Sequence, residues 1–195
     1  MNFAFGSSRC AWPWRHLPIS DGATPPPWTE GSYHKIIDEW GIEWWMPVEG
    51  GFYFDMRRHP LEHIDTIDGL KKIKFPDPLH PARFEAMAAR ADELMNQRQV
   101  AYVLGRNAPG IWEIALWMRG FENFFCDMAE RPDFAEALMD IICEIKMKYW
   151  TRALEVLGPN VMMISEADDL ASQDRFTVDR LVRAVVETDA QYIRA

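Results

Sequence analysis

The chain has 195 residues, 48% of them hydrophobic, and a formal net charge of −9 from 30 acidic and 21 basic residues. This composition supports a buried core, argues against wholesale disorder, and lacks the clustered Lys and Arg of a nucleic-acid-binding surface. The three cysteines have no CxxC spacing, so we expect no disulfide framework and no zinc site. No apolar stretch has the ~18 residues that a membrane span needs, and the N-terminus is unlike a signal peptide. We therefore expect a cytoplasmic protein.

The first 60 residues are expected to form an irregular arm followed by a hairpin. Prolines at positions 13, 18 and 25–27 exclude a long helix from residues 1–32. Residues 33–40 are predicted to be a short helix that ends at Gly41, because glycine is the common residue at a helix C-terminus. Residues 42–46 and 52–54 are β-prone, and the glycines at 50 and 51 between them indicate a hairpin turn.

From residue 66 onward the pattern alternates between helices and short apolar strands. Residues 100–104 and 161–164 are predicted to be parallel, neighbouring strands, each buried on both faces. The predicted helices cover 66–73, with Thr66 as N-cap, 81–97, 109–119, 121–129, 132–157 and 177–195. A strand, a long helix and a second strand in this order indicate a βα architecture. In such folds the chemistry lies in the loops that follow the C-terminal ends of the strands.

Several short motifs stand in the order and spacing of a known family. They are DEWG at 38–41, HPL at 59–61, VLGRNAPGIWEIALWMRG at 103–120, FENFFCDM at 121–128, LEVLG at 154–158 and ADDLASQ at 167–173. Together they resemble the uroporphyrinogen decarboxylase superfamily over roughly residues 35–176. Two of these segments, at residues 103–120 and 167–173, include the loops that follow the two predicted strands.

The resemblance implies an α/β fold that is the N-terminal half of the (β/α)8 barrel of this family. A complete barrel needs about 250 residues, and this chain has 195. Residues 1–32 would then be an irregular Pro/Trp-rich arm, and residues 33–195 an incomplete barrel domain. An open half-barrel leaves an unpaired strand edge, so we expect the chain to self-associate or to need a partner that supplies the second half.

The resemblance also implies a tetrapyrrole or corrinoid-type small molecule as the ligand. Decarboxylation of porphyrinogen acetate side chains, without cofactor or metal, is the first expectation. Methyl transfer linked to cobalamin is the second, because the DEWG and ADDL segments resemble that branch of the superfamily more closely.

The chain departs from both branches. Arg9 and Arg15 lie outside any RQAGRY motif of the decarboxylases, and Trp117 stands where those enzymes have a Tyr. No His or Cys follows Gln173 to form the His-x-Cys zinc site of the methyltransferases. A truncated, non-catalytic remnant is therefore the third expectation.

Two adjacent carboxylates, Asp168 and Asp169, are the candidate catalytic residues, because they follow a predicted strand. Such carboxylates can accept hydrogen bonds from pyrrole N–H groups and stabilise a protonated ring, and a like-charge pair favours one protonated member that serves as a general acid. The structural alternative is that one of them caps a turn and the other is solvated.

Arginine, tryptophan and glutamine side chains near the same loops are candidates for substrate binding. They are Arg106, Trp112, Trp117, Arg119 and Gln173. Arginine binds carboxylates bidentately, and indole rings line pockets. The side chain of Gln173 can orient a carboxylate or an amide. Core packing for the indoles and a solvated surface for the others are the alternatives. Pro60 interrupts the helical spacing of His59 and His63, so we expect no metal site.

Overall fold

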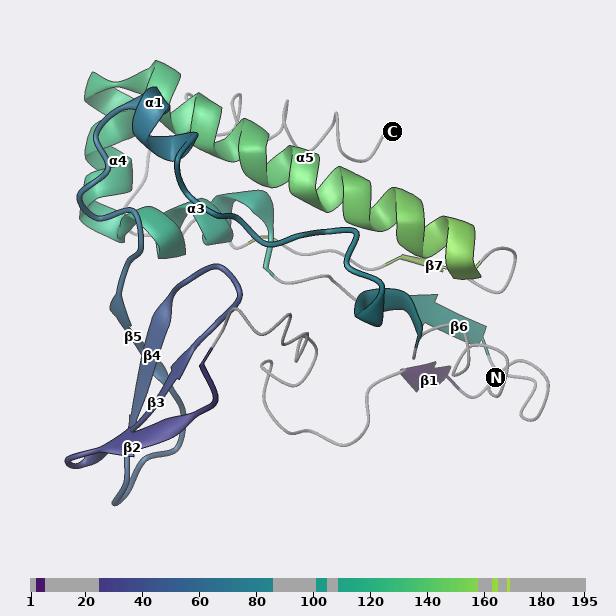
Figure 1. The fold of residues 1–195 in the computed structure, drawn as a ribbon, viewed down its shortest axis with the longest axis horizontal. Coiled ribbons are helices and arrows are strands. Elements are labelled where there is room, and N and C mark those ends of the chain that lie inside the picture. Colours follow the sequence, from purple (N-terminus) through teal and green to yellow (C-terminus); the bar gives the residue numbers. More distant parts are fainter. Residues whose placement is uncertain are drawn as a thin grey trace.

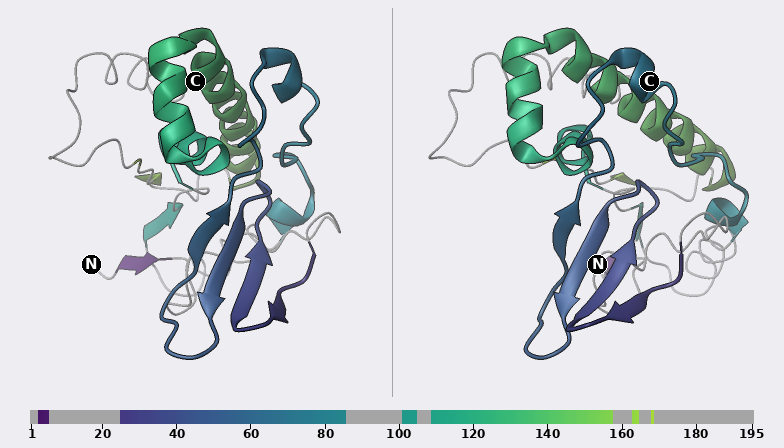
Figure 2. Two further views of the ribbon diagram at one scale, coloured as in Figure 1. Left: turned by 90° about the vertical axis from the view of Figure 1, so that its left-hand side faces the viewer. Right: turned by 60° about the vertical axis from the view of Figure 1, so that its left-hand side comes forward.

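The computed structural model describes residues 3–5, 25–85, 101–104, 109–157, 163–164 and 168. Within these residues, a four-stranded antiparallel sheet and a three-stranded parallel sheet accompany a layer of helices (Figure 1). Both views of Figure 2 show the antiparallel sheet projecting from one side of the helical layer. The strands are β1 (Phe3–Phe5), β2 (Trp28–Glu30), β3 (Tyr33–Ile37), β4 (Glu43–Pro47), β5 (Asp55–Arg58), β6 (Ala101–Leu104) and β7 (Met163–Ile164). The helices are α1 (Ile67–Leu70), α3 (Ile111–Arg119), α4 (Phe121–Glu130) and α5 (Pro132–Leu157), and residues 82–85 are also helical.

Short turns join the consecutive strands of the antiparallel sheet, which runs in the order β2-β3-β4-β5. In its central pair, Tyr33 lies opposite Pro47 and Ile37 opposite Glu43. The predicted hairpin around the glycines at 50 and 51 is confirmed, although its second strand covers residues 55–58 instead of 52–54. Two short strands, β1 and β2, lie within residues 1–32, which we expected to be irregular.

The helix predicted over residues 33–40 is wrong, because residues 33–37 form strand β3. Ile36 and Ile37 are β-branched and fit a strand better than a helix, and β2 and β4 pair with both edges of β3. Gly41 has the left-handed φ of +82° that a helix C-terminus also uses, but here it lies in the turn between β3 and β4. The glycine thus marks a turn, and local sequence does not separate a hairpin turn from a helix end.

The parallel sheet joins strands from distant parts of the chain in the order β1-β6-β7. Val103 of β6 lies opposite Met163 of β7, and Leu104 lies opposite Ile164. This register confirms the predicted parallel pairing of the two segments. The side chain of Met163 is 54% exposed, so the expectation that both strands are buried on both faces is wrong.

The fold class predicted from the family resemblance is also wrong. The largest sheet of the described residues is an open antiparallel sheet followed by helices, not the N-terminal half of a (β/α)8 barrel with parallel strands. The links are the reason, since only residues 38–42 and 48–54 separate β3, β4 and β5. Parallel neighbours need a crossover of a dozen or more residues, whereas links this short produce antiparallel pairs.

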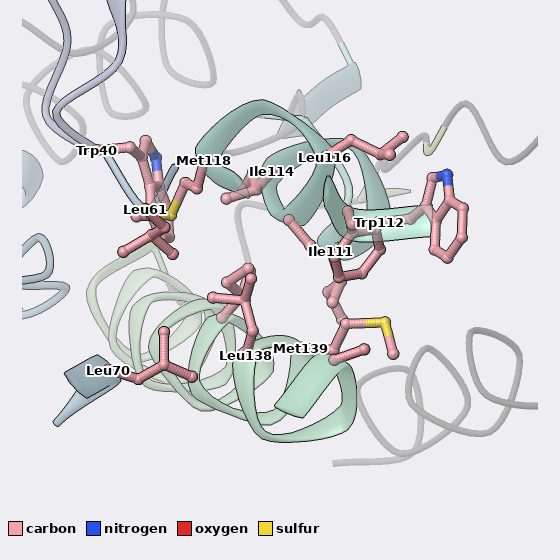
Figure 3. Close-up of a cluster of buried hydrophobic side chains, with 14 of the residues drawn as sticks. Trp40, Leu61, Leu70, Ile111, Trp112, Ile114, Leu116, Met118, Leu138 and Met139 are labelled. Carbon is pink, nitrogen blue, oxygen red and sulfur yellow. The ribbon is translucent and has the colours of Figure 1, made fainter. Parts of the chain in front are cut away.

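The hydrophobic core lies between α3, α4 and α5, and α5 begins and ends at the predicted residues. In Figure 3, Ile111 and Ile114 of α3 face Leu138 and Met139 of α5. Residues that precede α3 in sequence complete the core; they are Trp40, Ile42, Trp44, Leu61 and Leu70. Each large apolar side chain that is fully buried stabilises the fold by about 1.5–3 kcal/mol. No helix among the described residues is long and apolar enough to cross a membrane.

Helix α1 begins at its predicted cap. The Oγ1 atom of Thr66 accepts a hydrogen bond from the N–H of Gly69 at 3.1 Å, which satisfies one of the unpaired amides of the first turn. The helix ends at Leu70, three residues before its predicted end at residue 73.

The carboxylate of Asp38 organises the turn between β3 and β4. Its Oδ1 accepts hydrogen bonds from the N–H groups of Trp40 at 2.9 Å and Ile42 at 3.0 Å, and its Oδ2 accepts from Nε1 of Trp44 at 2.8 Å. Burial raises the pKa of Asp38 to about 6, although these three hydrogen bonds act in the opposite direction. The turn is therefore built on a carboxylate whose ionisation costs free energy in the folded protein.

We predict that Asp38→Asn removes a pH dependence of stability. In the unfolded chain an aspartate ionises near pH 3.9, whereas Asp38 in the folded protein has a pKa of about 6. Between these values the folded state holds more protons, so the free energy of unfolding falls as the pH rises. Relative to Asp38→Asn, the wild type should lose up to roughly 3 kcal/mol between pH 4 and pH 7.

Urea denaturation of both proteins at several pH values measures this difference. Asp140→Asn, an exposed substitution on α5, is the matched control and should follow the wild type at every pH. A difference between wild type and Asp38→Asn that stays constant with pH would contradict the prediction.

Candidate functional site

The segments that follow β6 and β7 meet at the start of α3. Because the two strands are parallel neighbours, they end at the same edge of the sheet. One carboxylate oxygen of Asp168 accepts the N–H of Trp112 at 2.8 Å, and the other accepts the N–H of Glu113 at 2.9 Å. Two motifs of the sequence resemblance, at residues 103–120 and 167–173, are thereby in direct contact.

Asp168 provides the cap that α3 lacks in its own sequence. The N-cap residue of α3 is Gly110, which has no side chain to accept a hydrogen bond from the first turn. The first amides of a helix have no partner within it, and an anion at this end is favoured by the helix dipole. A Cβ atom at position 110 would lie 2.0 Å from Cγ of Asp168. Glycine is therefore required at position 110 for Asp168 to approach the helix.

A buried lysine fixes the residue that precedes this cap. Lys146 of α5 is 1% exposed, and its Nζ donates a hydrogen bond to the carbonyl oxygen of Pro109 at 2.8 Å. The start of α3 is thus held from two directions, by Lys146 from α5 and by Asp168 from the segment after β7.

The two candidate tryptophans of α3 have packing contacts. The Trp112 side chain is 1% exposed and meets Phe124 edge to face, with ring centroids 5.2 Å apart. Trp117 is half-buried and meets Trp44 of β4 edge to face, also at 5.2 Å. The carbonyl oxygen of Trp117 accepts a hydrogen bond from Nδ1 of His59 at 2.6 Å. Trp112 thus packs in the helical core, and Trp117 joins α3 to the antiparallel sheet.

Arg119, a candidate for substrate binding, is 2% exposed at the C-terminal end of α3. Its Nε donates to Oδ2 of Asp127 at 2.6 Å, and Nη1 donates to the carbonyl oxygens of Leu61 at 2.6 Å and Glu62 at 2.8 Å. Nη2 donates to Oδ1 of Asp65 at 2.9 Å and reaches Oδ1 of Asp127 at 3.5 Å. All of its N–H groups have protein partners, so these contacts are structural.

The candidate residues are therefore only partly brought together. Asp168 contacts the first turn of α3 beside Trp112, whereas Arg119 lies seven residues further along the helix, about 10 Å at 1.5 Å per residue. Arg106, Asp169 and Gln173 lie outside the described residues.

Lys146 is the residue of this site that the sequence reasoning missed. Ile142 and Tyr149, four residues before it and three after it, are buried apolar residues of α5. Lys146 has the same helical spacing and therefore lies on the core-facing side, where a charged residue is rare. A lysine at a core position of an amphipathic helix was the available signal.

We predict that Arg119→Met lowers the free energy of unfolding by about 3–5 kcal/mol, because it leaves a buried charge without its main partner. Asp127 is 0% exposed and would retain Arg131 as its ion-pair partner. Arg152→Met, which removes an exposed ion pair with Glu155, is the control and should cost at most about 1 kcal/mol.

Chemical denaturation of the two variants provides the comparison. The double variant Arg119→Met/Asp127→Leu should recover part of the loss, because it removes both buried charges. An Arg119→Met protein as stable as Arg152→Met would show that the network contributes little.

We also predict that Asp168→Ala lowers the free energy of unfolding by about 1–2 kcal/mol, the usual cost of losing a helix cap. The free energy of unfolding of Asp168→Asn should lie between those of the wild type and Asp168→Ala, because its amide keeps one acceptor for the two N–H donors. Thermal unfolding should show a shift of about 2–4 °C per kcal/mol, and Asp140→Asn is again the control. An unchanged melting temperature for Asp168→Ala would mean that the cap contributes nothing to stability.

The described residues contain no group of three or more His, Cys, Asp or Glu side chains placed to hold a metal ion. Comparison with protein-family models, with curated protein sequences and with solved structures finds no match. The chemistry of the site therefore has to follow from its own residues and motifs.

Proposed function

We propose that this chain binds a tetrapyrrole at the edge where β6 and β7 end, as its resemblance to the uroporphyrinogen decarboxylase superfamily implies. One observation carries the proposal. Two motifs of the resemblance, at residues 103–120 and 167–173, are far apart in sequence, yet they touch through Asp168 and the amides of Trp112 and Glu113. The carboxyl ends of parallel strands are also the usual place for ligands in α/β folds. In this proposal the protein acts in the cytoplasm on porphyrinogens, whose acetate side chains it decarboxylates.

We assign different roles to the two adjacent aspartates, Asp168 and Asp169. Both oxygens of Asp168 accept backbone N–H groups, so this carboxylate shapes the loop and does not meet the substrate directly. Asp169 is then the carboxylate for the pyrrole N–H groups and for the positive charge that develops on a protonated ring. Asp168 thus takes the capping role of the structural alternative, and Asp169 keeps the proposed catalytic role.

Binding of substrate carboxylates needs a cationic side chain, and Arg106 is our candidate for this role. Arg119 is used by Asp127, Asp65 and two backbone carbonyl groups. Arg106 follows Leu104, the last residue of β6, by two positions in sequence. A guanidinium at this edge of the sheet would bind acetate or propionate side chains bidentately.

Corrinoid-linked methyl transfer remains the alternative, and the structure explains why the DEWG segment does not favour it. Asp38 organises the β3–β4 turn, Glu39 pairs with Arg83, and Trp40 packs in the core. We therefore attribute the similarity in this segment to structural contacts, and it does not distinguish decarboxylation from methyl transfer.

We predict that the purified protein binds uroporphyrin, the stable oxidised form of the substrate, at micromolar concentration. Quenching of tryptophan fluorescence measures the affinity, and hydroxocobalamin in a parallel titration tests the corrinoid alternative. Asp169→Asn and Arg106→Met should each weaken uroporphyrin binding roughly tenfold, the effect of one charge-assisted hydrogen bond. Asp140→Asn and Arg152→Met, both on the exposed face of α5, should bind as the wild type does.

Each outcome has a distinct meaning. Binding of hydroxocobalamin alone would replace decarboxylation with methyl transfer, and binding of neither compound would overturn the proposal. If uroporphyrin binds, anaerobic incubation with chemically reduced uroporphyrinogen decides whether the chain is an enzyme. Release of carbon dioxide would establish decarboxylation, and its absence would leave a binding protein without catalysis.

A further inference from the structure

A fully buried lysine is uncommon, because an ammonium group removed from water loses its hydration. Lys146 lies one helical turn from Ile142 and from Tyr149, both of them buried residues of α5. An apolar residue at this position would continue the core without that cost. The ammonium donates a hydrogen bond to the carbonyl oxygen of Pro109, at the beginning of the candidate site.

The residues before α3 do not determine on their own where the helix begins. Pro109 has no polar side chain, and Gly110 supplies no side-chain cap. The hydrogen bond of 2.8 Å from Nζ of Lys146 ties the Pro109 carbonyl to α5, which is the longest described helix. The first turn of α3 then begins at a defined place relative to α5.

Asp168 contributes a negative charge at the same end of α3. A positive charge close to the N-terminus of a helix is unfavourable alone, because the helix dipole is also positive at that end. The carboxylate of Asp168 accepts the N–H groups of Trp112 and Glu113 there, which favours the positive end of the dipole.

We propose that Lys146 is a positioning residue of the site. Its buried ammonium holds the Pro109 carbonyl, and this contact sets where the amides of Trp112 and Glu113 meet Asp168. Because Asp169 follows Asp168 in sequence, we expect the loss of the Lys146 ammonium to weaken tetrapyrrole binding as well. This last consequence rests on the proposed function, whereas the effect on Asp168 does not.

Hydrogen exchange at individual amides tests the proposal without any ligand. Lys146→Met keeps the apolar part of the side chain and removes the ammonium. The amides of Trp112 and Glu113 should then exchange roughly tenfold faster, because they lose a well-placed acceptor. Lys148→Met, two residues away on α5 in an exposed ion pair with Glu144, should leave their exchange unchanged.

A purely structural role for Lys146 gives a different pattern. Ile142→Val, which removes one methyl group from the core beside it, should accelerate exchange evenly over α3, α4 and α5. If Lys146→Met produces that even pattern, or no change, the proposal is wrong. Should Lys146→Met not fold, Lys146→Gln retains a neutral donor and gives the same local test. In Gly110→Ala the added Cβ would collide with Asp168. This variant therefore shows the exchange pattern that a displaced carboxylate produces.

Uroporphyrin titration separates this inference from the proposed function. If the wild type binds uroporphyrin, Lys146→Met should bind it roughly tenfold more weakly, as the loss of one charge-assisted contact predicts. Wild-type affinity in Lys146→Met, together with unchanged exchange at Trp112 and Glu113, would overturn the inference and leave the proposed function standing. If the wild type binds no tetrapyrrole, the proposed function fails, and the exchange pattern still decides the role of Lys146.

Discussion

The guanidinium of Arg119 is the contact on which the arrangement of the described elements most depends. It lies at the end of α3 and donates hydrogen bonds to Asp127 of α4 and to the carbonyl oxygens of Leu61 and Glu62. Because the group is buried, its donors need protein acceptors, and these come from α4 and from the segment between β5 and α1. The chain that leaves the antiparallel sheet is therefore held against the helices by polar contacts as well as by the apolar core.

Helix α3 is consequently held at both ends, and its two ends differ in character. At the C-terminal end, His59 donates to the Trp117 carbonyl and Arg119 contacts the segment around Leu61. At the N-terminal end, the partners are Lys146 and Asp168. The first end connects the helix to the antiparallel sheet and the second connects it to the parallel sheet. A helix restrained in this way can present its first amides to a carboxylate in a fixed orientation, which is what a binding site requires.

The sequence was sufficient for elements whose signals are local and periodic. The bounds of α5, the Thr66 cap and the parallel pairing of β6 and β7 follow from apolar spacing and from capping residues. The barrel was wrong because motif order says nothing about how strands are linked, and the turn at Gly41 was mistaken for a helix end. At the site, Asp168 was a candidate because it follows a predicted strand, but its capping of α3 and the contact of Arg119 with Leu61 join positions more than 50 residues apart. Such contacts leave no local pattern.

The position of Asp168 also has a consequence for the order of events during synthesis. A ribosome releases Leu61 and Asp65 before α3, so Arg119 finds these partners as soon as its helix emerges. Asp168 follows Trp112 by 56 residues, and the whole of α5 is made in between. Until Asp168 appears, the first turn of α3 has amides without this acceptor. The C-terminal end of the helix therefore has its partners Leu61 and Asp65 available earlier in translation than its first turn has Asp168.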